Sequence, residues 1–173
     1  MKRFFAILFL IGALTANAAP THSPALIELR DQFDAPQKLS FPTNRITLVT
    51  IADKKGSEQI EAWVAKVKER FGARIDVRGI ADVSTVPGPL QGMVRKKFKK
   101  LQNYSVMMDW SGSVVKAFAY APGAATILVL DPRGKILHST RGQASQRTIQ
   151  SLGDVIERAL ADSESKLSTA KSP

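Results

Sequence analysis

The stretch that most constrains the fold is an apolar run followed by a turn and an amphipathic segment. Residues Ile46–Ile51 read ITLVTI, which is typical of a strand buried on both faces. Apolar residues then recur at helical spacing until Gly72, a residue that favours the end of a helix. These apolar positions are Ile60, Trp63, Val64, Val67 and Phe71. Because Arg74–Ile80 predicts a second strand, the segment forms a β-α-β unit with parallel strands and a right-handed crossover.

The rest of the chain extends this pattern. A second helix is expected to start at Pro89, with Phe98 and Leu101 facing inward and Met93 in the core. A D-P-R-G turn from Asp131 to Gly134 predicts a β-hairpin. The other expected elements are strands at Tyr104–Met108, Thr126–Leu130 and Lys135–Thr140, a short helix within Val114–Tyr120, and a closing helix over Ile149–Leu160. This order predicts an α/β three-layer sandwich with a mixed central sheet flanked by helices.

The chain begins with the features of a cleavable signal peptide over residues 1–18. Lys2 and Arg3 precede an apolar run, Phe4–Leu14, and Ala16-Asn17-Ala18 is a small-x-small cleavage site. The run is shorter than the roughly 20 residues that span a membrane. We therefore expect a periplasmic protein that has no transmembrane segment after cleavage near Ala18.

The segments at either side of the expected domain are less regular. Residues 19–44 hold four of the nine prolines and predict an N-terminal lead with at most one short edge strand. Residues 45–161 are expected to form the domain. Residues 162–173 are polar and predict a disordered tail.

Composition limits the chemistry that this chain performs. The 173 residues include no cysteine, which excludes disulfides and every reaction of a thiol. The two histidines, His22 and His138, have no neighbours at ligand spacing, so neither a metal nor another cofactor is expected. The net charge of +10 at pH 7 favours an anionic partner.

Several motifs resemble those of the thioredoxin-like superfamily. IADKKGSEQI after the first strand, and the D-x-x-G turn and TILVLDPRGKI hairpin of the C-terminal half, are similar to thioredoxin and peroxiredoxin domains. The chain most resembles the YtfJ-like family of exported proteins. That likeness rests on Val86-Pro87-Gly88, Gly92-Met93-Val94-Arg95, Met108-Asp109-Trp110-Ser111-Gly112 and Leu128-Val129-Leu130-Asp131. It runs from about residue 45 to residue 161 and implies a thioredoxin-like fold.

Two departures from the redox pattern bear on function. Asp53-Lys54-Lys55-Gly56 stands where the resemblance places the reactive cysteines, and Ala125 stands where it places a cis-proline. A carboxylate cannot exchange with a disulfide or attack a peroxide, because both reactions need a thiolate. Direct thiol redox catalysis is therefore excluded.

The turn Asp53-Lys54-Lys55-Gly56 is the first candidate binding site. It is expected at the carboxyl end of a strand and the start of a helix, where backbone N–H groups and the helix dipole favour an anion. Asp53 as a catalytic base is a weaker alternative, since the nearby sequence holds no partner carboxylate or histidine. A solvated turn is the third interpretation.

The second candidate is a cluster of five cations, at positions Arg95, Lys96, Lys97, Lys99 and Lys100. On a helix they surround Phe98 and could hold an anionic surface or simply form a soluble face. Export makes nucleic acid an unexpected partner, which leaves an unknown protein or an anionic component of the cell envelope. Trp110 lies in the following turn, where we expect it to pack on the short helix.

Together these features predict an exported, non-redox binding or interaction module without catalytic residues. A non-thiol enzyme that uses the cleft around Asp53 is one alternative. A redox or regulatory protein, by family resemblance only, is the other.

Overall fold

The computed structural model describes residues 20–169, with side chains up to residue 165. The predicted signal peptide therefore lies outside the described residues. The seven strands are β1 (Leu26–Asp31), β2 (Pro36–Ser40), β3 (Ile46–Ala52), β4 (Ile75–Asp82), β5 (Met107–Asp109), β6 (Thr126–Leu130) and β7 (Ile136–Arg141). The helices are α1 (Ile60–Phe71), α2 (Gln91–Leu101), α3 (Ser113–Ala117) and α4 (Gln146–Thr169), with short 3-10 turns η1 (Gly56–Gln59), η2 (Gly72–Arg74) and η3 (Gly88–Leu90).

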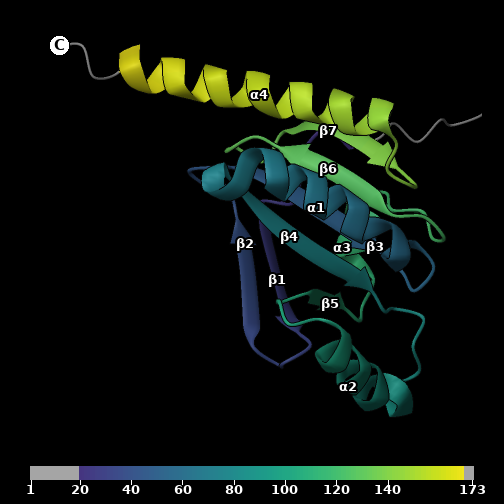
Figure 1. Cartoon of the computed structure of the whole chain (residues 1–173). Coiled ribbons are helices and arrows are strands. Elements are labelled where there is room, and N and C mark those ends of the chain that lie inside the picture. Colours follow the sequence, from purple (N-terminus) through teal and green to yellow (C-terminus); the bar gives the residue numbers. More distant parts are fainter. Residues whose placement is uncertain (1–19, 170–173) are drawn as a thin grey trace, which may run out of the picture.

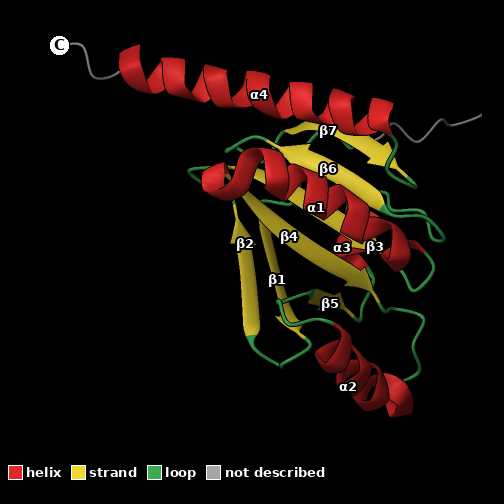
Figure 2. Ribbon diagram, viewed as in Figure 1, coloured by secondary structure: helices red, strands yellow, loops and turns green. Residues whose placement is uncertain are grey.

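The strands form one mixed sheet in the order β2-β1-β5-β4-β3-β6-β7 (Figure 1). β3 pairs in parallel with β4 and antiparallel with β6, as the β-α-β unit and the hairpin predict. All seven residues of β3 are buried, because helices cover both faces of the sheet at this strand. Figure 2 shows α1 and α4 on one face, which completes the predicted α/β sandwich.

Alternate residues of the central strands separate the two layers of the core. Ile46 and Leu48 of β3 contact the cluster that contains Trp63 of α1 and Ile156 of α4. Val49 and Ile51, which point the other way, pack in the cluster that includes α3. The period of two in this strand therefore explains the three layers.

Asp109 fixes the D-x-x-G turn that precedes α3. Its fully buried carboxylate accepts N–H groups from Gly112, Val114 and Val115, each at 2.9 Å, and the Ser111 hydroxyl at 2.9 Å. Gly112 has φ +71°, a backbone conformation that favours glycine. The turn thus satisfies the free N–H groups at the start of α3.

The N-terminal lead contributes two strands, where the sequence predicts at most one at the edge. β1 lies between β2 and β5, so of these two strands β2 alone is at an edge of the sheet. Ile27 and Leu39 face each other and are buried, which the alternating pattern of these strands explains. Pro36 is tolerated because it stands opposite Arg30 in a non-hydrogen-bonded pair, where its missing N–H faces the open edge.

Helix α4 corrects the predicted disordered tail. The helix continues from residue 162 to Thr169, and residues 170–173 lie outside the described part. Glu164 pairs with Arg74 at 3.3 Å, and the Ser163 hydroxyl donates to the Ala159 carbonyl at 2.8 Å. A polar composition here reflects an exposed helix surface rather than disorder.

Helix α2 is less buried than its sequence pattern predicts. Val94 and Phe98 pack on the cluster at the ends of β4 and β5. Met93 and Leu101 are each 66% exposed, so their predicted inward orientation is wrong. Helix α2 lies at the periphery of the sheet (Figure 1), and none of its residues is fully buried.

Candidate functional site

The Asp53 turn connects β3 to η1 and α1, as the sequence predicts, but its carboxylate is already occupied by the protein itself. Oδ1 accepts the Gly56 N–H at 2.8 Å, and Oδ2 accepts the Gly123 N–H at 2.8 Å. The Asp53 N–H donates to the Tyr120 hydroxyl at 2.8 Å. Asp53 therefore ties the start of the helical segment to the loop before β6.

The same loop packs directly on the turn. A Cβ at Gly56 would lie 2.7 Å from the Ala125 nitrogen, so only glycine fits there without a shift of the backbone. The Gln59 side chain accepts the Ala125 N–H at 2.9 Å. Ala125 thus lies against the turn, at the place where the resemblance puts a cis-proline. The one cis peptide bond within residues 20–169 is Phe41–Pro42.

Electrostatics make Asp53 a poor proton acceptor. Burial raises its pKa, but the N–H groups of Gly56 and Gly123, with help from Tyr120 and Lys55, outweigh that effect and lower the pKa below its usual value. Burial and the nearby Asp53 carboxylate raise the pKa of Tyr120 to about 12, although the N–H of Asp53 acts in the opposite direction. Because Asp53 stays ionised and hydrogen-bonded, its geometry gives a catalytic base no support.

The side-chain ammonium groups of Lys54 and Lys55 are not held in the same way. Lys54 and Lys55 are exposed, and neither forms an ion pair within the described part of the chain. The Gly56 N–H, which an external anion would use, is held by Asp53. Anion binding at this turn stays a prediction that the local hydrogen bonds do not favour.

The five cations of the second candidate separate into two groups on α2. Lys96, Lys97, Lys99 and Lys100 are exposed and form no ion pair with any described residue. Arg95 instead is half-buried, because it turns toward β1 and the turn after β5. No hydrogen bond or ion pair joins the α2 cations to the Asp53 turn within residues 20–169, so the structure does not combine the two candidates into one site.

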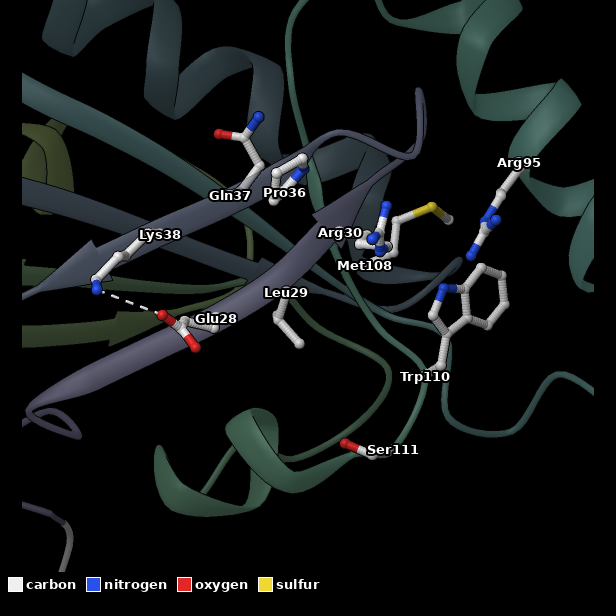
Figure 3. Close-up of a pocket in the computed structure, with 10 residues that line it drawn as sticks. All are labelled: Glu28, Leu29, Arg30, Pro36, Gln37, Lys38, Arg95, Met108, Trp110 and Ser111. Atoms are coloured by element: carbon white, nitrogen blue, oxygen red, sulfur yellow. Dashed lines mark ion pairs between the residues drawn. The ribbon is translucent and has the colours of Figure 1, made fainter.

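Arg95 instead belongs to an open groove between the β1–β2 hairpin and α2 (Figure 3). The cavity measures about 750 Å³. It is lined by Glu28, Leu29, Arg30, Pro36, Gln37, Lys38, Arg95, Met108, Trp110 and Ser111. Leu29, Met108 and Trp110 give it apolar walls. Lys38 is paired with Glu28 at 3.4 Å, so the positive charge of the groove comes mainly from Arg30 and Arg95 (Figure 3).

Trp110 and Arg95 form one wall of the groove. The Arg95 guanidinium lies 5.6 Å from the centre of the indole ring, a cation–π contact (Figure 3). Trp110 packs against the buried cluster of Ala81, Val83, Val106 and Met108, as do Val94 and Phe98. Its cation–π partner Arg95 belongs to α2 and not to the short helix that the sequence suggested. Nε of Arg95 and Nε1 of Trp110 are shielded from solvent and have no hydrogen-bond acceptor in the described structure.

Asp34 is the one carboxylate that joins the two arginines of the groove. Its Oδ1 lies 3.1 Å from Nη1 of Arg95, and its Oδ2 lies 3.4 Å from Nη1 of Arg30. Asp34 has φ +66°, a conformation that aspartate and asparagine tolerate better than most residues. One internal carboxylate therefore neutralises part of a two-arginine cluster, which keeps a net positive charge.

Sequence reasoning missed Asp34, Arg30 and the groove itself. The β1–β2 hairpin was not predicted, and it is this hairpin that places Asp34 and Arg30 beside α2. A signal was present in the alternation of Ile27 and Leu29 with charged residues, which is typical of a half-buried strand.

Comparisons with known proteins agree on the fold. No family model and no curated protein matches the chain. Among solved structures, a putative thiol:disulfide interchange protein DsbE from Chlorobium tepidum matches with a TM-score of 0.62 and 16% identity, over 83% of this chain and 99% of that one. The pneumococcal exposed lipoprotein thioredoxin Etrx1 from Streptococcus pneumoniae TIGR4 matches with a TM-score of 0.59 and 17% identity, over 80% and 99%.

A thioredoxin-family thiol:disulfide interchange protein from Chlorobium tepidum TLS matches with a TM-score of 0.56 and 20% identity, over 84% of this chain and 99% of that one. These likenesses show that the chain has a thioredoxin-like fold. They do not extend to thiol chemistry, because this chain has no cysteine.

Proposed function

We propose that this chain is an exported, non-redox binding module that holds an acidic segment of a partner protein in the groove between β1–β2 and α2. The observation that carries the proposal is the two-arginine cluster, Arg30 and Arg95, held by the internal carboxylate of Asp34. Asp34 shows that a carboxylate fits this position. The adjacent apolar walls, Leu29, Met108 and Trp110, suit the aliphatic side chains of a bound peptide.

The unpartnered N–H groups supply a further reason for an acidic ligand. A shielded N–H without an acceptor costs about 1–3 kcal/mol, so an incoming carboxylate that accepts it gains binding energy. Nε of Arg95 and Nε1 of Trp110 become accessible when Arg95 turns from Asp34 toward the ligand. The guanidinium fork then holds the carboxylate, with the indole ring beneath it.

Export and family membership belong to the same proposal. The basic and apolar leader before Ala18 supports secretion into the periplasm, and the PG…GMVR stretch supports membership of the YtfJ-like family. Within the described residues, no helix is long and apolar enough to cross a membrane.

Calorimetric titration with a synthetic peptide of alternating leucine and glutamate tests the proposed groove. Arg95→Gln should weaken binding roughly ten-fold, because the charge-assisted contact is lost. Asp34→Asn keeps the shape of the turn and removes the competing carboxylate, so it should strengthen binding several-fold. The matched control Asp162→Asn makes the same charge change at an exposed position of α4 and should leave affinity unchanged.

A peptide of alternating leucine and lysine provides the ligand control and should not bind. The proposal is wrong if Asp34→Asn weakens binding of the acidic peptide, or if neither groove substitution changes it.

A further inference from the structure

A second surface of the molecule combines unpaired charge with exposed apolar side chains. It is the solvent side of η3 and α2, here called the α2 surface, and consists of Leu90, Met93, Lys96, Lys97, Lys99, Lys100 and Leu101. It does not include Arg95, which faces the groove. Figure 1 shows α2 at the periphery of the molecule, where no other element covers this side.

Charge is uncompensated on the α2 surface. The sequence has no acidic residue between Asp82 and Asp109, and the four lysines form no ion pair with any described residue. The one ion pair of α2 belongs to Arg95. Such a cluster attracts a surface that carries many negative charges, because each lysine can face a separate anion.

The α2 surface also carries exposed apolar side chains, which a surface that served only to keep the protein soluble would not need. Leu90, Met93 and Leu101 are 45%, 66% and 66% exposed, and they account for half of the six exposed large apolar residues in the described structure. Together with Lys97 they follow the spacing i, i+3, i+7 and i+11, which places them along one flank of the helix. Lys96 and Lys100 lie beside this flank and can extend past it with their charged ends, as lysines do at a membrane interface, whereas Lys99 lies on the opposite side of the helix.

We infer that the α2 surface docks onto a membrane whose headgroups are anionic phospholipids. The lysines face the headgroup phosphates, while Met93, Leu101 and Leu90 enter the boundary between headgroups and acyl chains. A lipid surface fits better than a compact anion or an acidic protein, because it offers phosphates over the whole length of α2 and an apolar layer directly behind them. This inference concerns a surface and a ligand different from those of the groove, and it does not depend on the proposed peptide binding.

Vesicle co-sedimentation tests the inference directly. The protein should begin at Ala19, because the apolar leader would itself enter membranes and every described element lies within residues 20–169. We expect binding to vesicles that contain phosphatidylglycerol, little binding to pure phosphatidylcholine, and a steep decrease as salt is added.

Two sets of variants separate the contributions. Lys96→Gln, Lys97→Gln and Lys100→Gln should each weaken binding roughly five-fold, whereas Lys99→Gln, on the opposite side of the helix, should weaken it less. Met93→Gln with Leu101→Gln should weaken it by about ten-fold or more without affecting the fold, since both side chains are exposed. Matched controls are Lys54→Gln with Lys55→Gln, which removes two lysines at the Asp53 turn, and Leu26→Gln, which removes an exposed leucine of β1.

One pattern of results supports membrane docking, and three others contradict it. Loss of vesicle binding in both the lysine and the apolar variants, with the controls unchanged, supports membrane docking. Lysine dependence without an effect of Met93 and Leu101, binding to heparin or an acidic protein but not to vesicles, or no binding at all would each overturn it. None of these results bears on the acidic peptide titration, whose variants lie at Asp34 and Arg95.

Discussion

At the level of single residues, Asp53 fixes the turn between β3 and η1 in this cysteine-free chain. Its two carboxylate oxygens accept N–H groups from Gly56, at the start of η1, and from Gly123, in the loop before β6. The carboxylate of Asp53 thus has a structural role. It holds the turn against the loop before β6 instead of presenting a reactive atom to solvent.

Removing this carboxylate should therefore destabilise the protein. We expect Asp53→Ala to lower the free energy of unfolding by about 2 kcal/mol, because two partly buried N–H groups lose a charged acceptor. Asp53→Asn keeps an acceptor oxygen and should lose less. Urea denaturation measures both. A neutral effect of Asp53→Ala would show that the carboxylate does not hold the turn, and Lys54→Ala serves as the exposed control.

Asp31 and Asp53 also predict how stability changes with acid. Burial raises the pKa of both carboxyl groups, but hydrogen bonds outweigh this effect and leave both pKa values below the ordinary 3.8. The main hydrogen-bond donors to Asp31 are the Ser105 hydroxyl and the Ala35 N–H. The folded state therefore binds fewer protons than the unfolded state. Their stabilising contribution is complete above about pH 4 and is lost as the pH falls through the folded-state values.

Urea midpoints measured from pH 6 down to pH 2 check this dependence. The decrease should be smaller in the double variant Asp31→Asn with Asp53→Asn, which has lost the two carboxylates. An identical acid profile in the variant and the parent would contradict the proposed origin of the acid sensitivity.

At the scale of elements, α2 and the β1–β2 hairpin carry the features that distinguish this molecule. Asp34 of the hairpin turn and Arg95 of α2 are joined by an ion pair at 3.1 Å, and Trp110 fills the space beneath it. The central β-α-β unit and the β6–β7 hairpin could be predicted from local patterns, because buried β-branched runs and an Asp-Pro-Arg-Gly turn specify them directly.

The hairpin and the exposed side of α2 could not be predicted in the same way. The prolines in residues 19–44 argued against two strands in this segment. The sequence does not show that Pro36 lies on an edge strand, where its missing N–H is tolerated. Met93 and Leu101 fit the period of a buried helix face, but only Val94 and Phe98 have neighbouring elements to pack on. Periodicity predicts which residues share a face, whereas burial depends on what covers that face.

Two of the α2 lysines should lower the stability of the fold slightly. Lys96 and Lys100 are four residues apart on the helix and repel each other, and neither has an acidic partner in the described structure. Lys96→Gln with Lys100→Gln should raise the free energy of unfolding by about 0.2–0.5 kcal/mol. Thermal denaturation at low salt measures the change, and a clear loss of stability would show that these lysines have structural partners.

At the scale of the whole molecule, the chain keeps the thioredoxin-like fold and lacks the atoms of its redox chemistry. The described sheet and its helices match two thiol:disulfide interchange proteins over 99% of the length of each, with TM-scores of 0.62 and 0.56. The carboxylate of Asp53 is occupied by N–H groups of the protein itself, and the open groove lies elsewhere, beside α2. The fold thus serves as a scaffold on which a different surface is presented.

This view predicts that the protein has no thiol-disulfide activity. The purified chain should not accelerate the reduction of insulin by dithiothreitol, and it should not consume hydrogen peroxide with a thiol reductant, because both reactions need a thiolate. Turnover above that of the buffer in either assay, by protein free of contaminating thioredoxin, would refute the argument from the missing cysteines.

The proposed binding site is the Arg95–Trp110 groove and not the Asp53 turn. Nuclear magnetic resonance of ¹⁵N-labelled protein distinguishes the two sites, because the indole N–H groups of Trp63 and Trp110 give separate signals. The Trp63 indole donates to the Gly142 carbonyl at 2.9 Å, whereas the Trp110 indole has no acceptor among the described residues. On addition of the leucine–glutamate peptide, the Trp110 indole signal should shift while the signals of Trp63, Gly56 and Gly123 stay fixed. Shifts at Gly56 and Gly123 with an unmoved Trp110 signal would contradict the account.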